Sequence, residues 1–218
     1  MARLLFEKKG QAVWISHLDL MRLFQRAFKR AGLPLKHTQG FNPRPSVSIA
    51  LPLSVGVESG CELLDFELEG VSVSNDEIRQ RLNSALVAGV TVMDVYDTGR
   101  KIRDLALLDC SVLLEYDDGV DKAAEEEVSS LFRQDSLCVI KKSKNGPVEQ
   151  DILPMIRSIK VSACDDGLLL RALVCCQNPS LNPALLASAV ETYLPHRKPD
   201  HTVCVRNEIF DAQETIFR

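Results

Sequence analysis

The pattern of apolar and polar positions in the first half of the chain predicts alternating strands and amphipathic helices. Apolar residues form runs or recur at every second position in the strands, which we expect over residues 3–7, 46–53, 62–69 and 91–96. They recur every three or four positions in two helices, which we expect over 18–31 and 75–86. The resulting order is strand, helix, strand, strand, helix, strand.

The second half of the chain gives a variant of this order with an extra strand or extended segment. Its expected strands cover residues 107–116, 137–142, 155–163, 168–175 and 202–206, its expected helices cover 122–132 and 183–194, and a turn at 144–146 leads into an extra extended segment over 147–154. A βαββαβ order is the split unit of a ferredoxin-like fold. We therefore predict an α+β protein of two tandem ferredoxin-like domains with antiparallel sheets, residues 1–98 and 104–218, joined by a polar segment.

The helix over 18–31 has the clearest end signals in the chain. Ser16 can cap its N-terminus, and Asp19 stands where a capping-box side chain reaches back and where an acid suits the helix dipole. Gly32 can take the left-handed conformation that ends a helix, and Pro34 prevents the helix from continuing.

One face of this helix is basic. Arg22, Arg26, Lys29 and Arg30 lie on it, and the three arginines follow one another at intervals of four with no acid between them to pair with. Like charges at this spacing repel each other, which a helix tolerates when it binds an anionic partner. The alternative is an ordinary solvated face.

Positive charge is concentrated in the first fifth of the chain. Residues 1–45 contain nine lysines and arginines against two acidic residues, although the 218-residue chain has a net charge of −4. Such asymmetry indicates an anion-binding surface. No apolar run is long enough to span a membrane, and with 45% hydrophobic residues the composition is that of a globular protein. We expect a cytoplasmic protein without membrane contact.

A proline-stiffened loop follows the helix. Phe41 stands in it outside any periodic pattern, and the polar residues around it are His37, Gln39, Asn42 and Arg44. Aromatic side chains among basic and amide groups are typical of proteins that bind single-stranded nucleic acid. The alternative is that Phe41 folds back as a hydrophobic plug.

The sequence carries no recognisable catalytic or metal-binding motif. Its seven cysteines show no CxxC spacing, so we assign neither a metal site nor a catalytic residue, and the enzyme hypothesis is not favoured. His17 and His37 flank the basic stretch and suggest the alternative of a metal-independent ribonuclease, although a structural role for His17 in the first turn of the helix is favoured.

Several short words in the first third of the chain occur in a recognisable order. They are SHLDLMR from Ser16, RAGLP from Arg30, QGFNPRP from Gln39 and ALPL from Ala50. This stretch resembles the N-terminal signature of the radical SAM-linked proteins, a bacterial family encoded beside, or fused to the C-terminus of, a radical SAM protein. The resemblance is dense over residues 4–69 and looser beyond.

The resemblance implies a radical SAM protein as partner. This chain has no CxxxCxxC motif, so the S-adenosylmethionine and the iron-sulfur cluster would belong to that partner, and we expect no cofactor in this chain. Together with the basic helix the resemblance predicts a non-catalytic accessory protein that binds RNA, such as tRNA or rRNA, and presents it for modification. The expected binding residues are Arg22, Arg26, Lys29, Arg30, His37, Gln39, Phe41, Asn42 and Arg44. The alternative is a protein docking module for the same partner without RNA contact.

Overall fold

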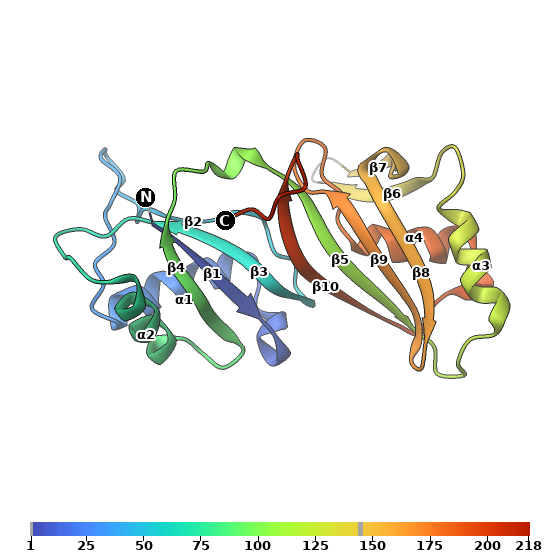
Figure 1. Ribbon diagram of the computed structural model, residues 1–218, viewed down its shortest axis with the longest axis horizontal. Helices are drawn as coiled ribbons and strands as arrows, with labels where there is room; N and C mark the ends of the chain where they lie inside the picture. The colour runs from blue at the N-terminus through green and yellow to red at the C-terminus, as the bar shows by residue number, and fades with distance from the viewer. Residues whose placement is uncertain (1, 144–145) are drawn as a thin grey trace. The chain divides into compact units, whose positions relative to one another are not determined.

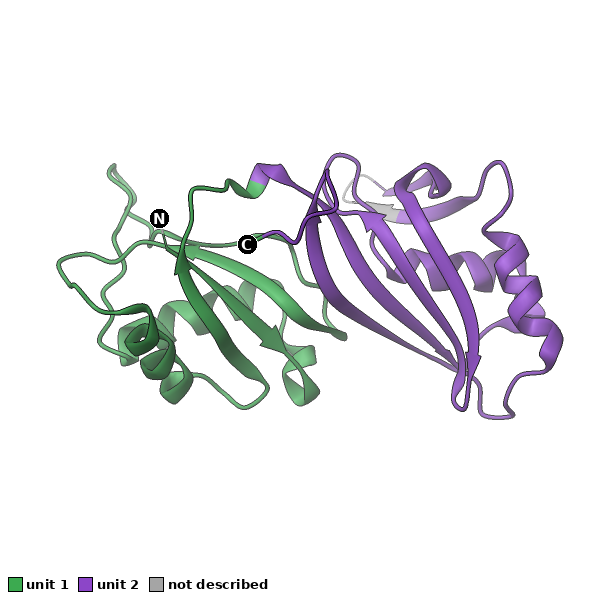
Figure 2. Cartoon of the chain, viewed as in Figure 1, with its two compact units in different colours: residues 1–102, 218 green, residues 103–217 purple. Residues whose placement is uncertain are grey.

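A computed structural model describes residues 2–143 and 146–218, which form two compact units (Figure 2). Unit 1 comprises residues 1–102 with residue 218, and unit 2 comprises residues 103–217. The division falls inside the polar segment expected to join two domains. The turn expected at 144–146 lies, apart from Gly146, outside the described residues.

Unit 1 contains an antiparallel sheet and two α-helices (Figure 1). Its elements are β1 (Ala2–Lys8), the short 3-10 helix η1 (Gly10–Trp14), α1 (His17–Arg30), β2 (Val47–Ile49), β3 (Val57–Phe66), α2 (Asn75–Ala85) and β4 (Val90–Asp97). Strand β1 pairs with both β3 and β4, and β2 pairs with the end of β3, so the strands lie in the order β4-β1-β3-β2.

Two of these strands differ from the prediction. The strand expected over 46–53 is only three residues long, and the one expected over 62–69 begins earlier, at Val57, and ends at Phe66. Strand β2 ends before Pro52, because proline has no N–H to donate to a ladder.

Helix α1 is formed as its end signals predict. Ser16 Oγ accepts a hydrogen bond from the backbone N–H of Asp19 and donates one to the Asp19 carboxylate. At the other end Gly32 has a φ of +66°, and the N–H groups of Gly32 and Leu33 donate to the carbonyl oxygens of Lys29 and Phe28. These two bonds are those of a Schellman motif. The sequence therefore fixes both the start and the end of α1.

The apolar stripe of α1 packs on the sheet of unit 1. The rings of Phe6 and Phe24 lie 4.7 Å apart in an edge-to-face arrangement, and those of Phe28 and Phe66 lie 5.0 Å apart. All four rings are buried. Edge-to-face pairs add to the stabilisation that burial provides, and they fix which face of α1 remains free.

Polar side chains are also buried in unit 1, which the alternation of β1 did not predict. Arg3 is fully buried, and its Nε and Nη2 donate to the carboxylate of Asp65 over 2.6 and 3.1 Å. Lys8 is fully buried as well, and its Nζ donates to the carbonyl oxygens of Val13 and Ile15 over 3.0 and 3.1 Å. A buried charge needs such partners to offset its lost hydration.

Unit 2 is built from a second antiparallel sheet, two α-helices and a separate two-stranded sheet. Its elements are β5 (Leu105–Glu115), α3 (Lys122–Leu131), β6 (Cys138–Ser143), β7 (Gly146–Asp151), β8 (Ile156–Cys164), β9 (Gly167–Cys175), α4 (Ala184–Tyr193) and β10 (His201–Asp211). The main sheet has the order β10-β5-β9-β8, whereas β6 pairs only with β7. The extra extended segment is therefore one strand of a hairpin inserted between α3 and β8.

The structure is that of a mixed α+β protein. The described residues form four α-helices, and every strand pairing within each unit that we describe is antiparallel. None of the helices in the described ranges is both long enough and apolar enough to cross a membrane.

Candidate nucleic-acid interface

The loop after α1 is a hairpin of residues 36–46 that projects from unit 1 (Figure 1, light blue). Its base is tied by backbone hydrogen bonds from Lys36 to Glu67 and from Ser46 to Lys36, over 2.9 and 2.7 Å. Higher up, the N–H of Thr38 donates to the carbonyl oxygen of Arg44, and the N–H of Arg44 donates back to Thr38 Oγ1. The hairpin is thus fixed to the sheet at its base.

The tip of the hairpin is exposed. Phe41 has a relative accessibility of 109%, and Gln39, Asn42 and Arg44 are exposed too. Gly40 has a φ of +138°, a conformation that L side chains rarely adopt, and it turns the chain beside Phe41. The alternative in which Phe41 folds back as a plug is therefore wrong.

Two arginines of α1 have partners that the sequence analysis did not foresee. Arg22 donates to the Asp19 carboxylate over 2.9 Å, so the arginine row does include an acidic partner, three residues before its first member. This contact holds the pKa of Asp19 below its usual value, together with the hydrogen bond from Ser16, which is the larger cause. Arg30 donates to the carbonyl oxygen of Ala85 over 2.6 Å, at the last residue of α2.

The remaining cations of this region are available to a ligand. Arg26, Lys29 and Arg44 are exposed, and across residues 2–143 and 146–218 none of the three side chains forms an ion pair. Lys36, by contrast, pairs with Glu67 over 2.9 Å. Three cations of this region are therefore free of ion pairs within the described residues, and the others have partners. We use the name basic-aromatic surface for Arg26, Lys29, His37, Gln39, Phe41, Asn42 and Arg44.

A groove joins α1 to the base of the hairpin. It has a volume of about 490 Å³, and its lining includes Gln25 and Lys29 from α1 as well as His37 and Pro45 from the hairpin. We call it the α1 groove. Lys29 and His37 were both predicted as binding residues, and they lie together in the groove. Gln25 was not predicted, although its spacing of four from Lys29 puts both side chains on the same face of the helix.

The two histidines considered for a ribonuclease lie at opposite ends of α1. His17 is the first residue of the helix, whereas His37 shares the α1 groove with Lys29. Twelve residues of α-helix separate His17 from Lys29, a length of about 18 Å. The two imidazoles therefore do not form a general acid and base pair on one substrate bond. Among the residues that the structure describes, no group of His, Cys, Asp and Glu is suited to hold a metal ion.

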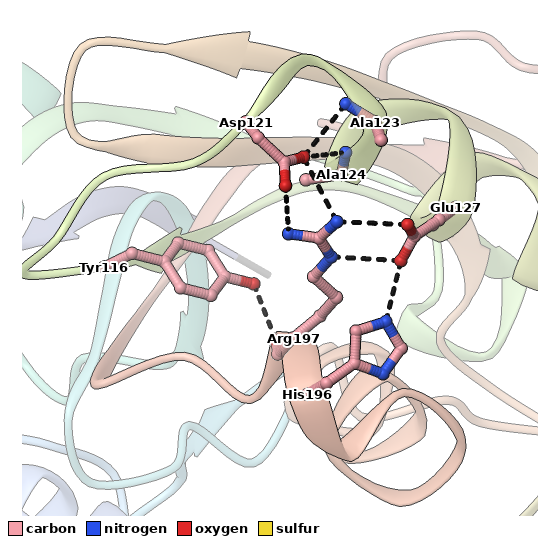
Figure 3. A network of polar contacts seen from close by, with 7 residues as sticks. All are labelled: Tyr116, Asp121, Ala123, Ala124, Glu127, His196 and Arg197. Carbon is pink, nitrogen blue, oxygen red and sulfur yellow. Dashed lines mark hydrogen bonds and ion pairs between the residues drawn. The ribbon is translucent and has the colours of Figure 1, made fainter.

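Unit 2 contains a separate polar network centred on Arg197 (Figure 3). The Arg197 guanidinium donates to both oxygens of Asp121 over 3.0 and 3.1 Å and to both oxygens of Glu127 over 3.0 Å. His196 Nε2 lies 2.8 Å from the same Glu127 carboxylate, and the Tyr116 hydroxyl donates to the Arg197 carbonyl oxygen over 2.8 Å. Arg197 therefore fixes the chain after α4 to α3.

The network also anchors the start of α3. Asp121 is the N-cap residue, and its Oδ1 accepts hydrogen bonds from the backbone N–H groups of Ala123 and Ala124. Hydrogen bonds from Arg197 and His196 lower the pKa of Glu127 to about 2, and a hydrogen bond from Arg197 is the main cause that lowers the pKa of Asp121. Each carboxylate is occupied by its partners, which indicates a structural role.

Two basic residues of unit 2 are not ordinary surface residues. The Arg197 side chain is only 17% exposed, because it lies between two carboxylates, and Arg206 of β10 is buried. The acids that hold Arg197 lie 70 and 76 residues away in sequence. A local sequence pattern cannot predict ion pairs between residues this far apart in the chain.

These features define a mixed α+β protein with an exposed basic and aromatic surface on its first unit. Residues 2–183 match the family described as an uncharacterised protein conserved in bacteria (DUF2344), and the chain belongs to this family. No curated protein matches the chain in sequence. A crystal structure of an unknown protein from Galdieria sulphuraria is 12% identical, with 94% of this chain and 96% of that chain covered, at a TM-score of 0.27. A TM-score this low does not establish a common fold.

Proposed function

We propose that this chain is a non-catalytic accessory protein that binds single-stranded RNA on the basic-aromatic surface and presents it to a radical SAM enzyme for modification. The observation that carries the proposal is the exposure of Phe41 at the tip of a hairpin whose base is fixed to the sheet. An aromatic ring that is held away from the core costs the fold hydrophobic burial. A base that stacks on the ring would recover that burial.

The charges around Phe41 support an RNA strand as the ligand. Arg44 is three residues away on the same hairpin, and Arg26 and Lys29 present cations from α1. Phosphate contacts from lysine and arginine give nucleic-acid binding most of its sequence-independent affinity. Gln39 and Asn42 at the tip carry amide groups that can donate and accept at the edge of a stacked base.

The strand orders of the two units support the finer description of the fold. A βαββαβ repeat supplies four strands, and in a ferredoxin-like sheet they lie in the order fourth, first, third, second. The orders β4-β1-β3-β2 and β10-β5-β9-β8 both follow this arrangement once the β6-β7 hairpin is set aside. We propose that each unit is a ferredoxin-like domain, with residues 1–98 as the first and residues 104–218 as the second, and that the β6-β7 hairpin is an insertion in the second.

The proposed partner rests on the resemblance of residues 16–56 to the radical SAM-linked proteins. The partner would supply the iron-sulfur cluster and S-adenosylmethionine, and this chain would supply RNA binding and orientation. The test of this part is purification of the tagged chain from its native cells with and without ribonuclease, followed by mass spectrometry. Recovery of a protein with a CxxxCxxC motif is expected, and its consistent absence would contradict the partnership.

The RNA part is tested by the salt dependence of binding. Phosphate contacts to single-stranded RNA release about 0.7 counterions each, so log affinity falls linearly with log salt concentration. The variant Arg26→Gln, Lys29→Gln, Arg44→Gln should lower that slope by about 2. The matched control replaces Arg157, Lys160 and Arg171, three exposed cations of unit 2, with glutamine.

The control has the same charge change at another place, so it separates a local surface from a general effect of net charge. The slope of the control variant should equal that of the wild type. If the wild type shows no RNA binding at low salt, or if both variants lower the slope equally, the proposed surface is wrong.

A second candidate function is a protein docking module that does not contact RNA, and one observation favours it. Trp14 and Leu18, at 69% and 67% relative accessibility, are large apolar side chains exposed in unit 1, and Trp14 lies beside Gly56 and the exposed Val55. Exposed aromatic residues are frequent at protein interfaces. Co-purification that survives ribonuclease and is lost in Trp14→Ser would support this function.

A further inference from the structure

Apolar side chains line part of the α1 groove, and we call this part its floor. The floor comprises the buried side chains of Phe28, Leu33 and Leu35, and the lining also includes Pro34 and Pro45. The volume of the groove, about 490 Å³, is within the range of sites that hold small organic ligands. The groove exists because the Schellman turn at the end of α1 brings Leu33 back onto Phe28.

The rim of the groove is polar and not acidic. The Gln25 amide and the His37 imidazole can each donate and accept hydrogen bonds, and Lys29 adds a cation. The lining residues in the described part of the chain include no carboxylate. An apolar floor with hydrogen-bonding groups and one positive charge on the rim is complementary to a nucleobase with its phosphate.

We infer that the α1 groove binds one unstacked nucleobase of the RNA, with the base on the apolar floor, its edge on Gln25 and His37, and its phosphate on Lys29. The inference rests on the proposed function and adds to it a second, base-specific site. A hydrophobic floor excludes water, and hydrogen bonds at the base edge then discriminate between bases, because an unmatched buried polar group is costly.

The groove and Phe41 hold different bases of one strand. His37 and Pro45, at the base of the hairpin, are each four residues from Phe41, a length of about 13 Å in extended chain. Stacked bases in one strand rise by about 3.4 Å. An RNA strand that places one base on Phe41 is therefore long enough to place another base in the groove. The two bases must unstack from each other, as bases commonly do when proteins recognise single-stranded RNA.

The first experiment compares an RNA of mixed sequence with an abasic ribose-phosphate oligomer of equal length, by fluorescence anisotropy at one salt concentration. The variant Gln25→Leu should bind the RNA about tenfold more weakly, the effect of one lost hydrogen bond of about 1.4 kcal/mol. Its affinity for the abasic oligomer should be unchanged. The control Gln80→Leu makes the same substitution on the exposed surface of α2 and should match the wild type with both ligands.

The second measurement does not depend on a variant. Each of the four nucleoside 5′-monophosphates is added to isotopically labelled wild-type protein, and backbone amide NMR signals are followed. Shifts at Gln25, Lys29, Leu35 and His37 support the inference. If RNA is bound while the signals of the groove stay unchanged and Gln25→Leu binds as the wild type does, the inference is overturned and the proposed function stands. If the wild-type protein binds no RNA, both fail.

Discussion

The guanidinium of Arg30 donates to the carbonyl oxygen of Ala85 over 2.6 Å, and this places a cation of α1 at the last residue of α2. The C-terminus of a helix carries unsatisfied carbonyl groups and a partial negative charge, which a cation stabilises. Lys29, the preceding residue, has no such contact and lines the α1 groove instead. Adjacent charges on one helix thus have different roles.

This difference predicts opposite results for two substitutions. Arg30→Gln should lower the free energy of unfolding by about 0.5 to 1 kcal/mol, a decrease in Tm of about 1 to 4 °C. It should weaken RNA binding only as much as the loss of one positive charge elsewhere on the surface does. Lys29→Gln should weaken RNA binding and leave Tm unchanged. Calorimetry and anisotropy on both variants provide the measurements, and equal effects of the two substitutions on RNA affinity would contradict the assignment.

Phe41→Ala should reduce RNA affinity without changing stability. A base stacked on an aromatic ring contributes about 1 to 3 kcal/mol, so the expected loss of affinity is about 5-fold to 150-fold. The exposed ring contributes nothing to the core. Phe41→Trp should retain binding. Ile140→Ala, a loss of exposed apolar surface in unit 2, serves as the control. A Phe41→Ala protein with wild-type affinity would show that no base stacks there.

The Arg197 network predicts a defined pH dependence of stability. Hydrogen bonds from Arg197 and His196 hold the pKa of Glu127 at about 2 in the folded protein, whereas the carboxyl titrates near 4.3 in an unfolded chain. A lowered folded pKa gives stability that is present above the unfolded value and is lost as pH falls toward 2. The loss should therefore occur between about pH 4.5 and pH 2.

Arg197→Gln removes the source of this effect. At pH 7 the variant should unfold at a lower temperature than the wild type, and the difference should shrink as pH falls from about 4.5 to 2. The control is Arg133→Gln, since the Arg133–Glu126 pair of 2.9 Å is well exposed and such pairs contribute little. A difference between Arg197→Gln and the wild type that stays constant down to pH 2 would exclude a titrating carboxylate as its cause.

The cysteines should differ sharply in reactivity toward an alkylating reagent. Burial raises the pKa of Cys110 and Cys176 to about 12 and that of Cys204 to about 11, so these thiols stay protonated at neutral pH. Cys164 is exposed and should be labelled first. Time-resolved iodoacetamide labelling with peptide mass spectrometry tests this order. Early labelling of Cys110 in the native protein would contradict the burial described for β5.

The sequence predicted those elements whose signals are local. Helix α1 was expected over 18–31 and is formed by His17–Arg30, because Ser16 and Gly32 act on the backbone within one turn of the helix ends. The ends of strands were predicted to within two residues for β1, β4, β5, β8 and β9, whereas β3 begins five residues before its expected start. Strand β10 is longer than its expected 202–206, since its ladder with β5 continues to Asp211 beyond the apolar alternation.

Contacts between distant residues could not be predicted in this way. Arg30 reaches a carbonyl 55 residues away, and Arg197 reaches its carboxylates across 70 and 76 residues. The Asp19–Arg22 pair was within reach of local reasoning, because an interval of three residues brings two side chains together on a helix. The prediction of an unpaired basic face rested on intervals of four between the arginines, and it is wrong for Arg22.

Polar residues in β1 show a further limit of pattern reasoning. Arg3 stands on the face of β1 opposite Leu4 and Phe6, and Lys8 stands on the same face as these two apolar residues. Both polar side chains are fully buried, because carbonyl and carboxylate groups of other segments accept their hydrogen bonds. The pattern of apolar residues predicts which face of a strand is buried. It does not predict which polar side chains are buried because they form hydrogen bonds in the interior.

Apart from the Lys36–Glu67 ion pair at its base, the hydrogen bonds described for the hairpin of residues 36–46 join backbone groups to one another and to the Thr38 hydroxyl. Its shape therefore does not depend on which side chains stand at Gln39, Phe41 and Asn42. The specificity of this protein can consequently change by substitution at the tip while the scaffold stays the same. We expect engineered tips with other side chains at these three positions to be accepted without redesign of the fold.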